Sequence, residues 1–427
     1  MEKIDIALKK ACESVTKRRT KDGHWIADKI RHYEPLELQK PLVRTGEAIF
    51  TYVFTKSQEN LPIVSRALQY CLDYNLENSD PLSLWAWKLM MASLSNTERA
   101  KKIQKYSINL LVKQQNRAGY WPYFPGKTYN LHNFMILWAL KDYDCKPTLD
   151  GAVKWLKKNK AKDGFGWSFD DAQTNSQVSF TANVSLALIS LGEDPISETL
   201  QTARKFLESK QFPNGGWHSS VRTVSDQPTT YGTALATLTL MLLSEDPLND
   251  KVKKGIKYLL NKQLKDGGWG LIDSDKASKS YTTYYSALTL AFYKFLKENL
   301  DLPKYAVLKG KIAPQHLAQL LWKAFEEDRM YWLKLAMAQS MLNSKLLGST
   351  TDAVNRRKDI LRILDETRAL TVAEIIDELK KKEAYSHLKK RSHITQIKND
   401  VEYLRGLNII HEFDGKYYVV SQVLRNT

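Results

Sequence analysis

The stretch QLKDGGW at residues 263–269 decides the fold, because it is one copy of a phrase that recurs along the chain. The other copies are TKDGHW (20–25), QNRAGYW (115–121), AKDGFGW (161–167) and QFPNGGW (211–217). The last four tryptophans are 46, 50 and 52 residues apart, whereas Trp25 and Trp121 are 96 residues apart. The spacing predicts a repeat of about fifty residues, with a degenerate copy around Cys71.

Each phrase joins two helical patterns of different character. An amphipathic pattern precedes it, as in KKGIKYLLNKQ (253–263), and a more apolar pattern follows, as in YTTYYSALTLAFYKFL (281–296). Apolar residues at three- and four-residue spacing predict helices, and an all-round apolar helix is typical of a buried one. We expect six outer and six inner helices between about residues 3 and 297, enough to close a ring.

The pattern Gln-x(3–5)-Gly-x-Trp, at 115–121, 211–217 and 263–269, resembles the QW repeat of the squalene cyclase and protein prenyltransferase superfamily. The resemblance covers roughly the first 300 residues and implies an all-α fold, an (α/α)6 toroid of six helical hairpins with a central cavity. We interpret the repeat residues as structural. Glycine permits a left-handed turn, the glutamine can bond loop backbone, and the tryptophan supplies apolar area.

The same resemblance implies where catalytic groups would lie. Class II terpenoid cyclases carry an Asp-x-Asp-Asp-Thr-Ala acid motif at an inner-helix start, and the aligned stretch QVSFTA (177–182) has no carboxylate. Prenyltransferases bind zinc through an Asp, a Cys and a His near the last repeats, but no cysteine follows Cys145. The Gly-Cys-Gly-Glu-Gln phrase of complement-type thioester toroids is also missing. We therefore expect no metal and no cofactor. The missing signatures favour a protein that is not an enzyme.

Two groups of residues remain as site candidates. Asp170 and Asp171 follow Trp167, and they could be a cavity-rim acid or a Mg²⁺-diphosphate ligand, or could merely solvate the loop and cap the next helix. Aromatic and imidazole side chains cluster near the inner-helix starts, and they could line a hole for an isoprenoid, a fatty chain or a nucleobase. These ligand-lining candidates are Tyr129, His132, Phe180, Tyr231, Tyr281 and Tyr285. Ordinary core packing is the alternative for each.

The C-terminal part of the sequence does not follow the repeat pattern. We divide the chain into the toroid (1–300), two linking helices (301–352) and a small α+β domain (353–427). In the last part, RRKDILRILDE, a capping box at Thr371–Glu374 and SHITQIKNDVEYLRGL predict three helices. NIIHEFDGKYYVV then predicts a hairpin that turns at Asp414–Gly415. Three helices followed by a hairpin resemble a winged helix-turn-helix domain.

The third of these helices presents polar residues that could contact DNA. With its apolar stripe inward, it and the hairpin would offer side chains suited to phosphates and base edges. They are Lys389, Lys390, Arg391, Ser392, Thr395, Gln396, Lys398, Asn399 and Lys416. A protein partner or a purely structural use is the alternative.

The net charge of +17 over 427 residues makes a polyanionic partner worth considering. From residue 353 onward, 15 Lys and Arg stand against 11 Asp and Glu, so only +4 lies there and +13 lies on the rest. No stretch approaches the ~18 apolar residues of a membrane span, and the first thirty residues are charged, so we expect a cytoplasmic protein. The three separated cysteines are expected to be buried thiols.

These observations lead to two functional hypotheses. The first is a non-catalytic toroid that serves as a scaffold or ligand sensor, coupled to a DNA-binding winged helix and possible protein partners. The alternative is an isoprenoid or terpenoid cyclase, or a prenyl transferase, that uses Asp170 and Asp171 and carries the winged helix as an accessory.

Overall fold

The computed structural model describes residues 2–26, 39–123, 130–169, 174–219, 227–300, 308, 311–345, 351–366, 370–381, 391–406, 410–413 and 415–419. It divides into two compact units, residues 1–326 and 327–427. The described part of the first unit is mostly helical and contains none of the named strands, which confirms the predicted all-α toroid.

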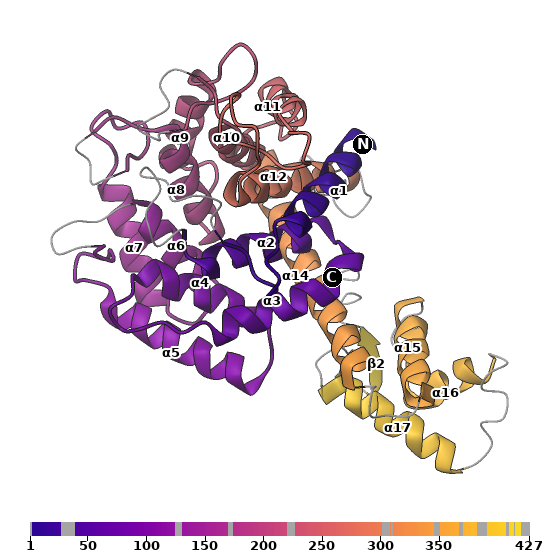
Figure 1. Ribbon diagram of the computed structural model, residues 1–427. Helices are drawn as coiled ribbons and strands as arrows, with labels where there is room; N and C mark the ends of the chain where they lie inside the picture. The colour runs from indigo at the N-terminus through magenta and orange to yellow at the C-terminus, as the bar shows by residue number, and fades with distance from the viewer. Residues whose placement is uncertain are drawn as a thin grey trace. The chain divides into compact units, whose positions relative to one another are not determined.

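The first unit is a ring of alternating outer and inner helices (Figure 1). The outer helices are α1 (Glu2–Lys17), α3 (Leu61–Asp73), α5 (Glu98–Gln114), α7 (Lys146–Lys158), α9 (Glu198–Ser209) and α11 (Asp250–Asn261). The inner helices are α2 (Pro41–Thr55), α4 (Leu82–Ser93), α6 (Asn130–Leu140), α8 (Val178–Ser190), α10 (Thr230–Leu243) and α12 (Ser280–Asn299). Each inner helix packs on the next, and α12 packs on α2, so the ring closes.

The burial of the inner and outer helices differs as predicted. Every residue of α10 except Tyr231 is buried, as expected for an inner helix that contacts neighbours on all sides. The outer helix α11 buries only one stripe, formed by Val252, Gly255, Ile256, Tyr258 and Leu259. This three- and four-residue spacing is the period of one helix face.

The five repeat tryptophans each join the end of an outer helix to the start of the next inner helix. All five side chains are at most 1% exposed. The indole Nε1 donates to a carbonyl near the outer-helix C-terminus, at Val15, Leu111, Leu156, Leu207 and Leu259 in turn. Such terminal carbonyls have no partner within their own helix.

The backbone of the same tryptophans marks an equivalent position on five inner helices. The tryptophan N–H donates to a side-chain oxygen of Thr45, Asn133, Thr181, Thr233 or Thr283. We call this residue the Trp-acceptor position. It gives a common register for comparing the inner helices.

The repeat glutamines tie each unit to the next. Gln263 Nε2 donates to the Gly267 carbonyl at 2.7 Å and to the Ala7 carbonyl in α1 at 2.8 Å, so the last repeat is bonded to the first. Gln115 and Gln211 make the equivalent pairs of bonds. Gly215 has φ +90°, and a Cβ there would lie 2.5 Å from the Lys254 carbonyl oxygen, so only glycine fits. The structural interpretation of these residues agrees with their contacts.

The degenerate second repeat uses a lysine where the others use a tryptophan. Lys88 of α4 is buried, and its Nζ donates to the carbonyls of Cys71, Leu72 and Tyr74 at 2.8, 3.0 and 2.5 Å. These carbonyls end α3 and would otherwise lack partners. Burial lowers the pKa of Lys88 to about 8. The expected outer helix around Cys71 is therefore present, with a cation at its C-terminus.

One long helix, α14 (Pro314–Lys345), spans a stretch where the sequence predicts two linking helices. It has no glycine, and its single proline is at the first position, so nothing in the sequence interrupts it. In the first unit, Trp322 and Phe325 of this helix are at most 2% exposed. Their ring centroids lie 4.9 and 5.4 Å from that of Phe292 in α12.

The second unit contains three helices and a hairpin around its own core. These are α15 (Thr351–Glu366), α16 (Val372–Lys380), α17 (Arg391–Gly406), β1 (Ile410–Phe413) and β2 (Lys416–Val419), with the strands antiparallel. The predicted capping box at Thr371 and Glu374 is formed. Asp400 of α17 is 3% exposed and pairs with Arg356 and Arg357 of α15. The order of elements is the expected one, and the assignment as a winged helix stays a prediction.

Two further findings concern the whole described chain. Cys12, Cys71 and Cys145 are buried free thiols, as expected. Among the described residues, no helix combines the length and apolarity that crossing a membrane requires.

Candidate functional site

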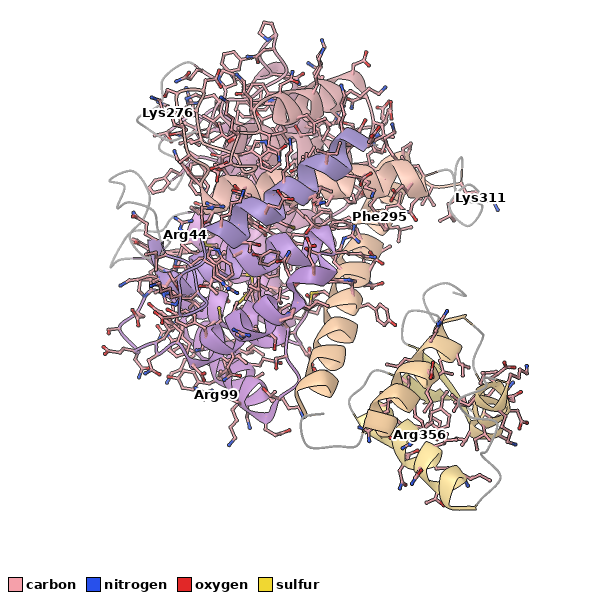
Figure 2. The ribbon with its side chains drawn as sticks, turned by 45° about the vertical axis from the view of Figure 1, so that its right-hand side comes forward. Arg44, Arg99, Lys276, Phe295, Lys311 and Arg356 are labelled. Atoms are coloured by element: carbon pink, nitrogen blue, oxygen red, sulfur yellow. The ribbon has the colours of Figure 1, made fainter. Side chains whose placement is uncertain are left out.

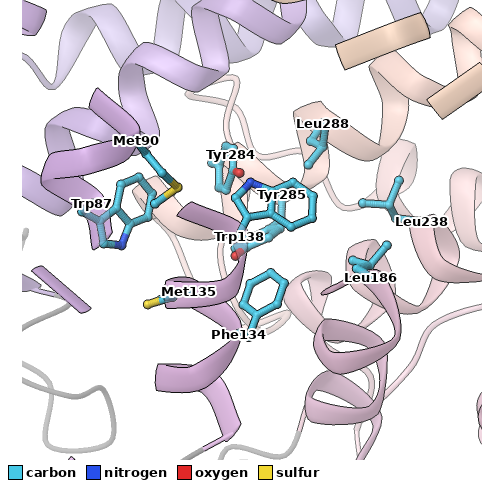
Figure 3. Close-up of a pocket in the computed structure, with 10 residues that line it drawn as sticks. All are labelled: Trp87, Met90, Phe134, Met135, Trp138, Leu186, Leu238, Tyr284, Tyr285 and Leu288. Carbon is cyan, nitrogen blue, oxygen red and sulfur yellow. The ribbon is translucent and has the colours of Figure 1, made fainter. Parts of the chain in front are cut away.

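Side chains from five inner helices surround a pocket in the first unit (Figure 3). The space between their atoms is about 430 Å³ when the open solvent within it is counted. The lining is Trp87, Met90, Phe134, Met135, Trp138, Leu186, Leu238, Tyr284, Tyr285 and Leu288. Apart from the two phenols it offers only apolar and aromatic surface, together with the indole N–H groups. This is a lining for an apolar ligand.

The repeat register explains which inner-helix residues face this pocket. Met135 and Tyr285 are each the second residue after the Trp-acceptor position. The fifth residue after it supplies Trp138, Leu186, Leu238 and Leu288. The second position holds Glu47 in α2, Asn183 in α8 and Leu235 in α10, and none of these three is among the lining residues. Asn183 also precedes the pocket residue Leu186 by one helical turn.

Three of the predicted tyrosines come together beside the pocket. The ring centroid of Tyr231 lies 5.5 Å from Tyr281 and 5.2 Å from Tyr285, both at steep angles. Tyr284 joins the group at 4.5 Å from Tyr285. Burial, and then the neighbouring phenol of Tyr231, raise the pKa of Tyr285 well above its ordinary value. Burial likewise raises the pKa of Tyr284, so Tyr284 and Tyr285 are neutral near pH 7.

A buried ion pair, which the sequence analysis missed, lies next to the tyrosines. Arg44 Nη1 donates to both carboxylate oxygens of Glu47, at 3.0 and 2.8 Å, and the two side chains are 3% and 6% exposed. The Arg44 guanidinium lies 5.5 Å from the Tyr281 ring centroid (Arg44 is labelled in Figure 2). The charge of Glu47 contributes to the raised pKa of Tyr284. The available signal was an Arg and a Glu three residues apart inside the apolar stretch LVRTGEAIFTYVF (42–54).

The remaining candidates lie in different places. Phe180 packs edge-on against Phe169 at 5.4 Å. His132 is 4% exposed, and its ring lies 5.3 Å from that of Tyr123. Within the described part of the chain, neither ring nitrogen of His132 has a hydrogen-bond partner. Tyr129, Asp170 and Asp171 lie outside the described residues.

His132 should make the protein sensitive to acid. Burial lowers the pKa of its imidazole to about 4, whereas the unfolded chain keeps a value near 6.5. Between these two values the unfolded state binds more protons, so stability falls as the pH drops through this window, by up to about 3 kcal/mol. Urea unfolding at pH 7 and pH 4.5 should show a smaller loss for His132→Phe than for the wild type. His316→Gln, which changes a surface imidazole, is the control, and an equal loss in all three proteins would contradict this role.

The predicted DNA-contacting residues are only partly described. Thr395, Gln396, Lys398 and Asn399 are exposed on α17, and Lys416 is exposed at the start of β2. Arg391 and Ser392 begin α17, whereas Lys389 and Lys390 lie outside the described residues. Arg405 pairs with Glu402 and Glu412 and so is already neutralised.

The inner helices that build the pocket carry a family signature. Residues 176–283 match the squalene-hopene cyclase C-terminal domain. The matched segment contains α8, α10 and the start of α12, and thus Leu186, Leu238 and the Tyr231–Tyr281 contact. This match supports the assignment of the toroid to the squalene cyclase superfamily.

Similar proteins point the same way. A terpene cyclase/mutase of Nectria sp is 37% identical over 105 residues, which are 23% of this chain and 14% of that protein. Lanosterol synthase of Saccharomyces cerevisiae is 32% identical over 121 residues, which are 26% of this chain and 16% of that protein. The chain thus matches only a small part of each relative's length. An alpha-amylase structure from Clostridium perfringens, 14% identical with a TM-score of 0.51 over 67% of this chain and 97% of that one, shares the fold alone.

These matches contradict the first functional hypothesis. A non-catalytic scaffold or sensor coupled to a DNA reader was favoured because the cyclase acid motif at residues 177–182, the prenyltransferase zinc ligands and the thioester phrase are all missing. The same segment lies within the squalene-hopene cyclase match, and the two relatives are named a terpene cyclase/mutase and a lanosterol synthase. The argument was wrong because a motif missing from one helix start does not exclude acidic groups elsewhere, as Glu47 in α2 shows. No comparison supports DNA as a partner.

Proposed function

We propose that the toroid is a terpenoid cyclase that folds an acyclic isoprenoid in the pocket and closes rings in it. The observation that carries the proposal is the aromatic and apolar lining, to which the matched helices α8 and α10 contribute. A flexible hydrocarbon chain gains free energy by leaving water, at roughly 25 cal/mol per Å² of buried surface.

The pocket also suits the chemistry of ring closure. Protonation of a terminal alkene leaves a carbocation, and attack by a second double bond forms the ring bond and moves the positive charge along the chain. Loss of a proton then restores a double bond, so the product is an isomer of the substrate. The ring faces of Trp87, Trp138 and Tyr285 can stabilise such cations, and the Glu47 carboxylate supplies a nearby negative charge.

The proton donor in this proposal is the pair Asp170 and Asp171. Alkene protonation requires a carboxylic acid, and this pair follows Trp167 directly before the start of the matched segment. The neutral tyrosines are too weak as acids for this step, because burial raises the pKa of Tyr285 well above its ordinary value.

Product analysis tests the proposal. We expect the full-length protein to convert farnesol or geranylgeraniol into cyclic isomers of unchanged mass, detected by gas chromatography with mass spectrometry. Changing Asp170 and Asp171 together to Asn should lower the rate by at least about a hundredfold. Asp273→Asn is the matched control, because Asp273 follows Trp269 in the last repeat and pairs with Lys262 at the surface. Finding no cyclic product, or full activity in the double variant, would overturn this assignment.

We also propose that residues 353–427 form a winged helix-turn-helix accessory domain. Three helices, the hairpin and a backbone bridge between Leu370 and Tyr417 support this assignment. Its apolar core includes Ile360, Ile375, Ile397 and Val401. A fragment of these residues should give a cooperative urea transition, and a non-cooperative one would argue against an independent domain.

A further inference from the structure

Asn183 is one of several buried polar side chains on the inner helix α8. It is 1% exposed, and its neighbours Ala182 and Val184 in α8 are buried as well. Its Nδ2 donates to the Tyr231 phenol oxygen at 3.3 Å. Its Oδ1 has no hydrogen-bond partner among the residues that the structure describes. A buried acceptor left unpaired costs about 1–3 kcal/mol, so a group that satisfies it would bind favourably.

The location of this acceptor connects it to the pocket. Asn183 occupies the register position that in α6 and α12 supplies the pocket residues Met135 and Tyr285. Its partner Tyr231 contacts Tyr285 at 5.2 Å. Asn183 is not itself among the lining residues, and it lies one helical turn before the lining residue Leu186.

The charges around the pocket indicate what kind of ligand group would pair with Asn183 Oδ1. The second and fifth positions of the described inner helices carry no lysine or arginine. The cation beside them, Arg44, is already neutralised by Glu47 at 2.8 Å. A diphosphate or carboxylate would thus find no unpaired cation among these positions. An acceptor oxygen instead calls for a neutral group that donates a hydrogen bond.

We infer that the pocket takes an isoprenoid alcohol whose hydroxyl donates a hydrogen bond to Asn183 Oδ1. The inference rests on the proposed function, because it names the polar group of the same isoprenoid ligand. Asn183 is a specificity residue in this scheme, and Tyr231 positions it by accepting from Nδ2. A hydrocarbon would leave the acceptor unpaired, and an ether, which carries oxygen but no donor, would do the same.

Three ligands of equal chain length test whether the ligand must donate a hydrogen bond. The binding of farnesol, farnesyl methyl ether and farnesene to the full-length protein is measured by quenching of tryptophan fluorescence. We expect the wild type to bind farnesol about tenfold more tightly than either of the others. Asn183→Leu, which keeps the volume and removes the acceptor, should bind the three ligands with similar affinity. Ser185→Ala, which removes another buried polar group of α8, should keep the wild-type preference.

The outcomes divide clearly. If the wild type binds the alcohol and the ether equally, or if Asn183→Leu keeps the preference, the inference is overturned while the isoprenoid pocket stands. If none of the three ligands binds, the proposed function fails together with it. The comparison of alcohol with ether in the wild type needs no variant, so a poorly folded Asn183→Leu protein would not hide the answer.

Discussion

Replacing Trp217 with alanine is expected to lower the free energy of unfolding of the toroid by about 3–5 kcal/mol. The side chain is completely buried, and its Nε1 donates to the Leu207 carbonyl at 2.7 Å. The substitution opens a cavity between α9 and α10 and removes the indole donor at the end of α9, where the Leu207 carbonyl keeps the Lys210 N–H at 3.2 Å. Urea unfolding followed by circular dichroism measures the loss.

Two further substitutions locate the cause of this loss. Trp217→Phe keeps most of the apolar area but removes the N–H, so we expect about 1–3 kcal/mol. Phe165→Ala changes an aromatic residue of another repeat phrase that is 54% exposed, and it should stay within about 0.5 kcal/mol of the wild type. Equal effects for Trp217→Ala and Phe165→Ala would show that the repeat tryptophan does not hold the helices together.

Breaking the buried ion pair of α2 should have an effect of similar size. Arg44→Met leaves the Glu47 carboxylate buried without its bidentate partner, which typically costs about 3–5 kcal/mol. The double variant, Arg44→Met combined with Glu47→Leu, replaces both charges by apolar groups of similar volume. Replacement of a whole buried pair is often close to neutral, so the double variant should recover most of the lost stability. The free energy of unfolding of the two variants, measured in urea at pH 7, gives the comparison.

The double variant also separates stability from function. If it is as unstable as Arg44→Met, the loss comes from packing rather than from an unpaired charge. If it is stable but cyclises no isoprenoid, the Glu47 charge belongs to the chemistry of the pocket. We expect the second result, because Glu47 shares its register position with the pocket residues Met135 and Tyr285.

The repeat was readable from the sequence because its signals are local. Trp269 reaches the Leu259 carbonyl ten residues earlier, and Gly267 turns the chain between them with φ 93°. Five copies of this arrangement, spaced at one or two repeat lengths, predict the hairpins and their number. Even the copy without tryptophan was located, although its use of Lys88 in place of an indole was not foreseen.

The site was harder to predict because its parts come from distant repeats. Tyr231, Tyr281 and Tyr285 were named from their place before or within apolar helices, and the structure brings them together. Arg44 and Glu47 were passed over, although charges within an inner helix were a usable signal. Asn183 became a candidate site residue only in the structure, because its Oδ1 has no hydrogen-bond partner among the described residues. The predicted scaffold function failed because it relied on missing catalytic signatures, one of them at residues 177–182 inside the segment that matches squalene-hopene cyclase.

By itself, the sequence determined the helical repeat, the closed ring and the division into buried inner and amphipathic outer helices. These features depend on periodicity and on contacts within one repeat, where chain distance is short. The tertiary structure alone decided which polar groups meet the pocket, since Glu47 and Tyr285 lie in the first and last hairpins and become neighbours only when α12 packs on α2. Which charges and hydrogen-bonding groups meet where α12 packs on α2 depends on distances in three dimensions. No local sequence pattern encodes these distances.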